Sequence, residues 1–535
     1  MSCVLALSFH PAFYPPKSGG EERLYNIYNN LSRHFKVKLI TFTYPNAKNS
    51  VERVNHNESF TEIRIPKTKL NAVFHHLINR CSDIKECSAV VTSLESRFNR
   101  NFKKVLEGEI ENADTIIFVY PFLYTVPGRL LNGKKIIYES HNLEYELMKE
   151  AFSNSLLGKL LLAYVFYLEK SLSTKSSFIF AVSEENKAKF SSLYGIGRNK
   201  VYVSPNGVNP DVYNSLFKEN SSLSGSRICA FIGSYHPPNI EAIENIAEIA
   251  CKMPDTLFYV AGNVSQYFVS SNLVEKTDLD VHSILSPQKV TLADGFYGVE
   301  YWNSVPTVWC MPEFRIKVPE TVESLELKAY SPDNKTLKAR IGSRSDSFSL
   351  KAGWNPVKIK DLKDKSPDIL FGCEPFKNDT RSLGVAVQEI RYSENGNTFK
   401  FDLNQGSNQL YALKNAKNVI FLGRVSDEEK QALYRVADIA LNPMTSGSGT
   451  NIKMLDYMAA GLPVVSTSVG ARGLNLENYE NAIICDIPDF PVRINQILSD
   501  SKLYSKISSN GRRTVEDNFD WSKIASEMVK VLGQT

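Results

Sequence analysis

Residues 442–474 contain the glycines and side chains best suited to hold a phosphate. Their sequence is NPMTSGSGTNIKMLDYMAAGLPVVSTSVGARGL, with Gly447 and Gly449 in a loop directly before an apolar helix predicted over 452–460. Glycines let backbone N–H groups approach phosphate oxygens, and the positive end of a helix dipole favours an anion. Taken alone, a G-x-G of this kind also fits an ordinary loop–helix–strand unit, so both interpretations stay open at this point.

Other candidate residues follow predicted strands. The string PPKSGGEERLYN places Gly19–Gly20 just before a helix, and IIYESHNLEYE ends a strand at His141. FIGSYHPPN and FLGRVSDEEK place Ser234 and Arg424 after two further strands. Ligands of α/β proteins bind beyond the carboxyl ends of parallel strands, and a guanidinium suits phosphate oxygens. In isolation, a Gly-Gly turn or a single histidine is more often structural, and for Arg424 a structural role is as well supported as a functional one.

The elements around these residues belong to two regions that alternate short β-rich runs with helical periodicity. This alternation is typical of doubly wound parallel sheets. The first region spans residues 1–210, and the second begins near 211 with a strand, a loop, a helix and a strand. In the first region we predict strands over 4–8, 37–43, 115–119, 135–139 and 178–183, and helices over 20–34, 89–107 and 143–173.

The second region is interrupted by a sequence of another kind. Between 266 and 415 the chain has short alternating runs such as EFRIKV, SLELKAYS and TLKARIG, separated by turn-forming residues. Strands at this spacing predict a β-sandwich. Because α/β periodicity resumes near Asn418, we expect a sandwich domain inserted in the second α/β domain, with its two ends close in space.

This predicted insert carries three of the four tryptophans, Trp302, Trp309 and Trp354. An exposed aromatic ring could stack on a sugar and give the insert an accessory role in carbohydrate binding, whereas a buried ring would fill the sandwich core. For each tryptophan individually, the core is the favoured interpretation.

Together these motifs resemble those of family four glycosyltransferases, which have the GT-B fold of two Rossmann-like domains facing each other across a cleft. The 442–474 string resembles the family's donor-binding segment, PPKSGGEERLYN its N-terminal glycine loop, and VYVSPNGVNPDVY the linker between its domains. The resemblance covers about residues 1–265 and 416–535. It implies an N-terminal acceptor-side domain over 1–210, a donor-binding domain over 211–265 and 416–535, and an inserted β-sandwich over 266–415. More weakly, the tryptophan-containing segment resembles sandwich inserts of other bacterial polysaccharide glycosyltransferases.

By this resemblance the reaction moves a sugar, with retention of configuration, from a nucleotide-diphosphate sugar to a saccharide or lipid-linked saccharide in surface polysaccharide synthesis. His141 would contact the donor sugar or the acceptor, and Asp456 the ribose hydroxyls. No metal or other cofactor is expected, because main-chain amides and basic side chains would neutralise the leaving diphosphate. The candidate catalytic residues are therefore His141, Gly20 and Asp456, and the candidate donor-binding residues are Gly19, Ser234, Arg424, Gly447, Ser448, Gly449, Thr450 and Lys453.

The chain departs from the family pattern at two places. Most members have two glutamates separated by seven residues, where this chain has Ser448 and Asp456. Many members have a basic residue soon after the first C-terminal strand, where this chain has Ser234, His236 and Asn239. The string GSGTNIK resembles a sub-branch in which the backbone amides of residues 448–450 and the side chain of Lys453 hold the diphosphate.

The composition and charge of the chain favour some classes of protein and of partner over others. The chain has 535 residues, of which 43% are hydrophobic and 22% charged, as in globular proteins of several domains. A net charge of +4 argues against nucleic acid as a partner and leaves a local basic face towards a membrane open. The eight cysteines form no C-x-x-C pair, so a reduced cytoplasm fits best, with the inner face of the plasma membrane as a second option. In the apolar run 156–168, Lys159 favours a core helix over a membrane anchor.

Two other functions stay open. One is a nucleotide-sugar epimerase on the same fold, which would need acid–base carboxylates around the sugar, and the Ser448 position has none. The other is an inactive relic that binds saccharide through the β insert, against which the intact Gly19–Gly20, His141 and GSGT loop argue. Binding of a nucleoside diphosphate would separate an enzyme from such a relic.

Overall fold

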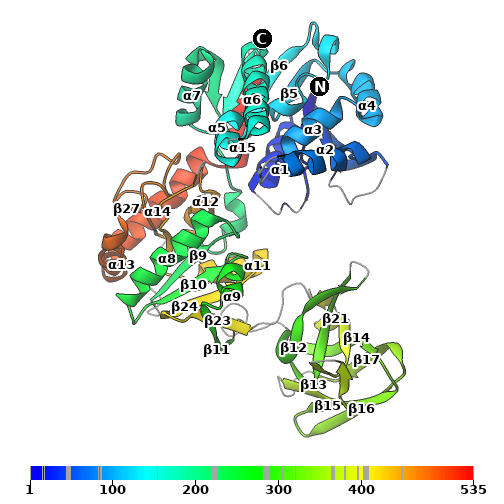
Figure 1. Cartoon of the computed structure of the whole chain (residues 1–535). Coiled ribbons are helices and arrows are strands. Elements are labelled where there is room, and N and C mark those ends of the chain that lie inside the picture. The colour runs from blue at the N-terminus through cyan, green and yellow to red at the C-terminus, as the bar shows by residue number, and fades with distance from the viewer. Residues whose placement is uncertain are drawn as a thin grey trace.

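Three large sheets organise the chain (Figure 1). The structure, a computed structural model, describes residues 2–533 except 15, 17–18, 44–49, 82–83, 85–86, 153–154, 218–226, 281–289, 303–304, 320, 363–367, 379–380, 395–396, 402–408 and 448–449. The first sheet belongs to the N-terminal domain, the second to the C-terminal domain, and the third to an insert domain between β11 and β23 of the second sheet.

The sheet of the N-terminal domain has the order β3-β4-β2-β1-β5-β6-β7-β8 and is parallel except for β3. Its strands are β1 (Cys3–Leu7), β2 (Lys36–Phe42), β3 (Glu52–Asn57), β4 (Phe60–Ile65), β5 (Thr115–Phe118), β6 (Lys135–Ser140), β7 (Phe178–Ala181) and β8 (Val201–Val203). Its helices are α1 (Gly19–Leu31), α2 (Lys69–Cys81), α3 (Ser88–Ser96), α4 (Arg100–Ile110), α5 (Glu144–Ala151), α6 (Leu156–Lys175) and α7 (Glu184–Tyr194). The central strands bury nearly every side chain, since helices cover both faces of a parallel sheet.

The five predicted strands of this domain are confirmed, but two predicted helices are each divided in two. The helix predicted over 89–107 is interrupted at Asn99, whose side chain accepts a hydrogen bond from the Phe102 N–H and so starts α4 anew. The helix predicted over 143–173 breaks before Ser155, which caps α6 through the Gly158 N–H. The β3–β4 hairpin and α2 have no counterpart among the predicted elements.

The sheet of the C-terminal domain has the order β11-β23-β24-β10-β9-β25-β26-β27. Its strands are β9 (Ile228–Ile232), β10 (Leu257–Ala261), β11 (Val274–Asp280), β23 (Gln409–Leu413), β24 (Ala416–Gly423), β25 (Ile439–Asn442), β26 (Val464–Ser466) and β27 (Ile483–Ile484). The helices of this half are α8 (Pro237–Cys251), α9 (Ser265–Ser270), α11 (Asp427–Val436), α12 (Ile452–Ala459), α13 (Phe490–Ser499), α14 (Ser501–Asn518) and α15 (Trp521–Leu532). Within the range predicted for the insert, β11 and β23 pair antiparallel at the edge of this sheet.

The insert domain is all-β, with its strands hydrogen-bonded into one sheet of order β16-β15-β18-β13-β21-β14-β17, to which β12 and β22 add. Its strands are β12 (Thr291–Trp302), β13 (Val305–Lys317), β14 (Val322–Ser331), β15 (Lys335–Ile341), β16 (Arg344–Leu350), β17 (Gly353–Lys360), β18 (Asp368–Gly372), β21 (Ala386–Glu394) and β22 (Asn397–Phe401), with a separate hairpin of β19 (Phe376–Asn378) and β20 (Arg381–Leu383). Alternate residues of β14 and β15 point into one apolar core, as predicted from the period of two.

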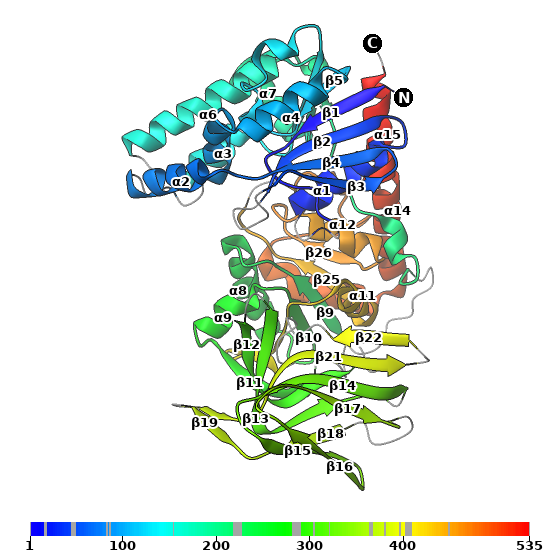
Figure 2. The same ribbon diagram turned by 90° about the vertical axis from the view of Figure 1, so that its right-hand side faces the viewer.

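The C-terminal helix α15 crosses back to the N-terminal domain (Figures 1 and 2). Trp521, Ile524 and Met528 of α15 are buried in the apolar cluster that also contains Leu24 and Ile27 of α1. A Cβ at Gly207 in the linker would lie 2.7 Å from the Phe519 carbonyl oxygen, so only glycine lets the two crossing segments pass. The two domains are therefore joined by two crossing segments, the linker and the start of α15.

Replacing Trp521 by alanine should destabilise the N-terminal domain, because the indole is 2% exposed and fills space between α15 and α1. We expect a loss of about 3–5 kcal/mol, as for other large-to-small changes in cores. Thermal unfolding measures the effect, with Lys523→Ala on an exposed part of the same helix as control. Equal midpoints for the two variants would contradict the packing described.

Candidate active site

Three loops meet at the carboxyl edge of the C-terminal sheet. The Gly262 N–H donates to the Gly423 carbonyl oxygen at 2.6 Å, which joins the loops after β10 and β24. Gly262 has a φ of 105°, and a Cβ there would lie 2.1 Å from the Gly233 carbonyl oxygen, so glycine is required for this approach. Ser234 follows Gly233 directly, and Arg424 is exposed at the end of β24. Both predicted donor-binding residues thus lie at the edge where α/β proteins bind ligands.

Lys453 of α12 reaches the first turn of α8, directly after the loop that follows β9. Its ammonium donates to Asn239 Oδ1 at 2.7 Å and lies 4.2 Å from the centre of the Phe231 ring. Asn239 in turn donates to the Ser234 carbonyl oxygen at 2.9 Å. Burial lowers the pKa of Lys453 to about 7. The segment between β9 and the first turn of α8 contains no lysine or arginine. Lys453 of α12 instead places an ammonium group beside this segment.

The glycine loop before α12 is held by side chains on both sides. Arg472 donates to the Gly447 carbonyl oxygen at 2.6 Å, and Gly447 has a φ of 108°. The hydroxyls of Thr445 and Ser446 donate to Glu241 of α8, and these hydrogen bonds lower the pKa of that carboxyl. The loop is thus anchored to both α8 and the segment after β26. The predicted residues Ser448 and Gly449 lie outside the described part of the chain.

The two domains meet at the first turns of α1 and α12. A Cβ at Gly19 would lie 2.6 Å from Ile452 Cδ1, whereas one at Gly20 would meet nothing within 4 Å. The N-terminal ends of two helices from different domains therefore face the same space. Since both ends carry partial positive charge, the space between them favours an anion.

Asp456, one turn further along α12, is already paired within the protein. It accepts from the Tyr213 hydroxyl at 2.9 Å and lies 3.5 Å from the Lys430 ammonium. Burial and the charge of Asp456 raise the pKa of Glu22 on α1 to about 7. Two carboxylates from different domains thus lie in one electrostatic cluster, and the predicted contact of Asp456 with ribose stays a prediction.

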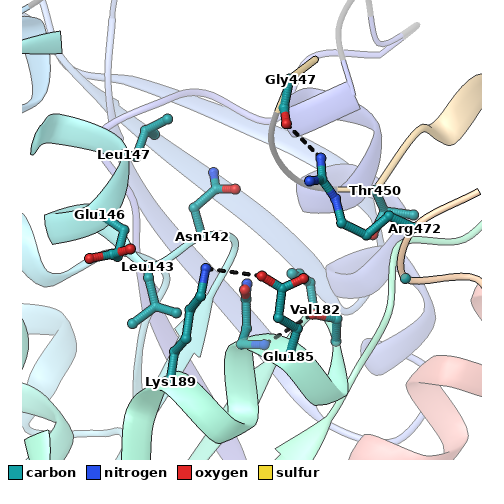
Figure 3. Close-up of a pocket in the computed structure, with 13 residues that line it drawn as sticks. Asn142, Leu143, Glu146, Leu147, Val182, Glu185, Lys189, Gly447, Thr450 and Arg472 are labelled. Carbon is teal, nitrogen blue, oxygen red and sulfur yellow. Dashed lines mark hydrogen bonds and ion pairs between the residues drawn. The ribbon is translucent and has the colours of Figure 1, made fainter. Parts of the chain in front are cut away.

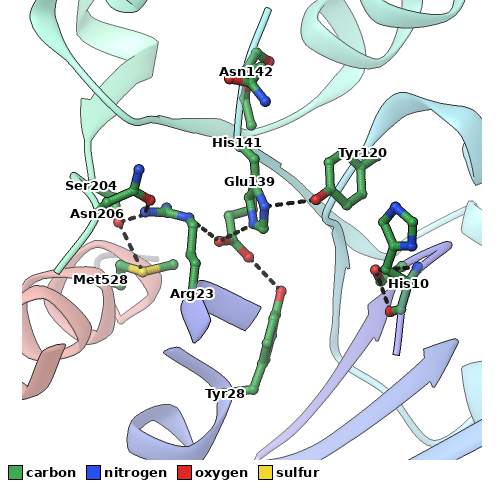
Figure 4. A network of polar contacts seen from close by, with 12 residues as sticks. His10, Arg23, Tyr28, Tyr120, Glu139, His141, Asn142, Ser204, Asn206 and Met528 are labelled. Atoms are coloured by element: carbon green, nitrogen blue, oxygen red, sulfur yellow. Dashed lines mark hydrogen bonds and ion pairs between the residues drawn. The ribbon is translucent and has the colours of Figure 1, made fainter. Parts of the chain in front are cut away.

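His141 lies at the centre of a buried polar network (Figure 4). Its Nε2 is 3.2 Å from Glu139 Oε1 and its Nδ1 is 2.9 Å from the Tyr120 hydroxyl. Burial lowers the pKa of His141, so the imidazole is neutral at pH 7. Because an ionised carboxylate only accepts, Nε2 carries the proton and the Tyr120 hydroxyl donates to Nδ1. Both ring nitrogens are occupied, and the substrate contact predicted for His141 stays a prediction.

Arg23 of α1 completes this network. Its Nε donates to Glu139 Oε1 at 3.1 Å and its other nitrogens donate to Ser204, Pro205 and Asn206 of the interdomain linker. Burial would raise the pKa of Glu139, but hydrogen bonding by His141, the charge of Arg23 and the Tyr28 hydroxyl outweigh it and lower the pKa to about 2. The helix that begins at Gly19 is therefore fixed to both the strand end at His141 and the linker.

A cavity of about 180 Å³ lies between the two domains (Figure 3). One wall is formed by Asn142, Leu143 and Glu146 and the other by Gly447, Thr450 and Arg472. Lys189 and Glu185 of α7 form an ion pair of 3.0 Å at its side. The cavity joins the strand end at His141–Asn142 to the glycine loop, two segments that the sequence analysis selected separately.

Four residues that hold the segments of the site in place were not predicted from the sequence: Arg23, Glu139, Glu241 and Arg472. Glu139 could have been suspected, since it lies two residues before His141 on the same strand end. Arg472 and Glu241 form hydrogen bonds with the glycine loop from other segments of the chain. Arg23 pairs with Glu139, which lies 116 positions away in the sequence. No local pattern marks such contacts.

Solved structures with this architecture define the class of fold. Sucrose-phosphate synthase from Thermosynechococcus elongatus superposes with a TM-score of 0.55 and 13% identity, over 100% of this chain and 99% of that one. WaaG, a glycosyltransferase involved in lipopolysaccharide biosynthesis, superposes with a TM-score of 0.51 and 12% identity over 99% and 100% of the two chains. The chain has the GT-B fold, with an all-β domain inserted in its C-terminal half.

Family models match both halves. Residues 17–212 match the model of Glycosyltransferase Family 4, and residues 388–500 match that of Glycosyl transferases group 1. Spore coat protein SA of Bacillus subtilis is 25% identical over 235 residues, which are 41% of this chain and 59% of the relative. Phosphatidyl-myo-inositol mannosyltransferase of Mycobacterium tuberculosis is 29% identical over 123 residues, 22% of this chain and 32% of the relative. The chain thus matches less than two thirds of the length of these curated relatives.

Replacing Arg23 by methionine should destabilise the protein by about 3–5 kcal/mol, because Glu139 would lose its buried counter-charge. The double variant Arg23→Met/Glu139→Met should be less destabilised than the sum of the two single variants, as expected for coupled neighbours. Urea unfolding measures both effects, with Lys523→Met as an exposed control. Strict additivity of the two single variants would contradict a coupled pair.

Proposed function

We propose that this chain is a glycosyltransferase that transfers a sugar, with retention of configuration, from a nucleotide-diphosphate sugar to a saccharide or lipid-linked saccharide. The observation that carries the proposal is the position of Lys453 beside Asn239 and Ser234, at the edge where three loops meet. The matches of both halves to glycosyltransferase families support it. So does the UDP-glucose bound by HepE of Anabaena, a structure of the same fold with a TM-score of 0.51.

The diphosphate of the donor would lie between the N-terminal ends of α12 and α1. There the Lys453 ammonium supplies a full positive charge, and the backbone N–H groups of the first turns supply partial ones. Donors fixed in place before the reaction stabilise the charge that develops on a leaving diphosphate. This arrangement needs no metal ion, because the cationic role falls to Lys453 and the helix ends.

Retention is expected from the resemblance to family four glycosyltransferases, and the remaining candidates have the following proposed roles. His141, neutral and fixed by Glu139 and Tyr120, borders the strand end that leads to the cavity at Asn142. Gly20, which has open space at its Cα, lets a substrate approach the first turn of α1. Asp456 would accept from the ribose hydroxyls, in exchange for its present hydrogen bond from Tyr213. Arg424 would reach the donor from the neighbouring loop.

The interdomain cavity is the proposed acceptor site. Its walls mix amide, carboxylate, hydroxyl and cationic groups, which can both donate to and accept from sugar hydroxyls. A role in surface polysaccharide synthesis is supported by two similar proteins, WaaG of lipopolysaccharide biosynthesis and a protein in the cps region of Klebsiella pneumoniae that is 35% identical over 108 residues, 20% of this chain and 27% of that protein.

We further propose that the N-terminal domain contacts an anionic membrane from the cytoplasmic side. No helix in the described ranges has both the length and the apolar character to cross a bilayer. Two exposed apolar stripes instead run along α2 and α6, which share one apolar cluster through Ile78 and Leu161. The stripe residues are Leu70, Val73 and Leu77 of α2, 40–49% exposed, and Leu156, Leu160 and Tyr167 of α6, 59–78% exposed. Exposed basic residues Lys69, Arg80, Lys159 and Lys170 flank them, as in helices that lie at a membrane surface.

Binding of a nucleoside diphosphate should depend on Lys453. We expect UDP, GDP or TDP to raise the unfolding temperature of the wild-type protein, and Lys453→Met to weaken binding about 10- to 100-fold, the effect of losing a charge-assisted hydrogen bond. Titration calorimetry measures the affinity. Exposed Lys502→Met on α14 is the matched control and should leave binding unchanged.

The affinity should also fall as pH rises. Lys453 has a pKa of about 7 in the free protein, so it is charged at pH 6 and mostly neutral at pH 8. A bound diphosphate stabilises the charged form, hence binding above pH 7 must take up a proton and weakens by up to about tenfold per pH unit. If no nucleoside diphosphate binds, the proposal fails and a relic that binds only saccharide becomes the better interpretation.

Membrane binding should depend on the α2 stripe. The double variant Val73→Glu/Leu77→Glu should lose most sedimentation with vesicles that contain anionic phosphatidylglycerol, because each glutamate removes apolar contact and adds repulsion. Val492→Glu on α13, where the valine is 61% exposed, is the matched control in the C-terminal domain. Unchanged sedimentation of the double variant would rule out this surface.

A further inference from the structure

Four aromatic side chains form a second cluster in the insert domain, separate from its main core. Trp302 lies 5.6 Å from Trp309, 5.3 Å from Tyr330 and 6.0 Å from Trp354, measured between ring centres, and every pair is edge-to-face. Leu327 and Ala329 of β14 point into the main core, so Tyr330 of the same strand points to the opposite face. The cluster therefore lies on the outer face of the sheet.

The outer end of this cluster is open to solvent. Trp309 is 7% exposed, but Trp354 is 40% exposed, which contradicts the expectation that each tryptophan would fill the sandwich core. Tyr330 packs against Trp354 at 5.4 Å, and the Lys328 ammonium lies 5.0 Å from the Trp354 ring centre. These contacts fix the orientation of the exposed ring, so a ligand that stacks on it does not have to order it first.

A row of polar pairs continues from Trp354 along the same outer face of β21, β14 and β17. Lys328 donates to Gln388 at 2.8 Å, the next pair along β14 joins Glu326 to Lys358 at 3.3 Å, and the last joins the hydroxyls of Ser324 and Ser393 at 2.7 Å. From Tyr330 to Ser324 this face, the aromatic–polar strip, extends over seven residues or roughly 20 Å. Its exposed side chains include Trp354, Pro356, Lys358, Lys360, Lys328 and Arg391.

We propose that the aromatic–polar strip binds a saccharide chain. An aromatic face stacks on the C–H face of a sugar ring, and fixed donors and acceptors in rows pair with its hydroxyls. The strip offers one exposed ring followed by alternating amide, ammonium, carboxylate and hydroxyl groups. Such a surface suits an extended, hydroxyl-rich polymer better than an apolar partner, because beyond the ring its rows are polar. Two of its basic residues, Lys358 and Arg391, are paired with Glu326 and Glu389, which disfavours a uniformly anionic nucleic acid.

The position of the strip defines what it would do. In both views the insert domain extends from the C-terminal domain on the side away from the N-terminal domain (Figures 1 and 2). A saccharide chain held by the strip lies outside the interdomain cavity. The strip would therefore bind a part of the polymer away from the end that reacts. Retention on a second site raises the local concentration of a chain end at the first. The inference goes beyond the proposed transferase activity and does not depend on it.

Affinity gel electrophoresis of the full chain tests the proposal, with dextran, barley β-glucan or hyaluronan in the gel. We expect at least one polymer to retard the wild type and to change its tryptophan fluorescence. Trp354→Ala should weaken the retardation at least fivefold, and Trp354→Phe should retain most of it because a ring remains. Lys338→Ala, an exposed lysine on β15 outside the strip, is the matched control and should migrate as the wild type.

Three results would overturn the proposal: no retardation by any of the three polymers, retardation that Trp354→Ala leaves unchanged, or a wild-type dimer that Trp354→Ala converts to a monomer without any polymer binding. The last would make the strip a contact between copies of the chain. Nucleotide binding distinguishes this test from that of the active site, since Trp354→Ala should keep the UDP affinity and Lys453→Met should keep the polymer retardation.

Discussion

The close approach of α1 to α12 is the constraint on which the candidate active site depends. Gly19 packs against Ile452 so closely that a methyl group at residue 19 would displace the isoleucine. This contact brings together the N-terminal ends of two helices from different domains. A methyl group at position 19 would require Cδ1, at the flexible end of the Ile452 side chain, to shift. Neither domain alone could provide the combined positive potential.

The same contact places negative charge one turn away. Glu22 and Asp456 lie in one cluster with Lys430 and Tyr213, and the pKa of Glu22 rises to about 7 because burial and the neighbouring carboxylate both oppose its ionisation. The interface therefore combines a region that attracts an anion with one that disfavours a second carboxylate charge. The Arg23 network fixes α1 to Glu139 and to the linker. It therefore holds this helix in place at the interface between the two domains.

The sequence predicted those parts of the structure that depend on local pattern and on resemblance. Alternation of β-rich and helical runs located the strands of the N-terminal domain, and the change of period located the insert. The glycine loop and Lys453 were selected because they occur in one continuous string. The Arg23–Glu139 pair and the anchoring of Gly447 by Arg472 could not be derived, because each joins residues that come together only in the folded chain. Trp354 shows a further limit of prediction from the sequence. The period of two in a strand predicts which residues share a face of the sheet, but not which face is covered by the rest of the protein.

The attachment of the insert explains why the α/β core tolerates it. The chain leaves and re-enters through β11 and β23, which pair antiparallel with each other, while β23 also pairs antiparallel with β24. Both strands lie at the edge of the sheet, so the parallel order β24-β10-β9-β25 that carries the loops of Ser234 and Arg424 is unbroken. Because the two connecting strands are neighbours, closing the long insertion adds little entropy cost to folding of the core. The sheet edge at Ser234 and Arg424 and the aromatic–polar strip can then differ in function without either constraining the sequence of the other.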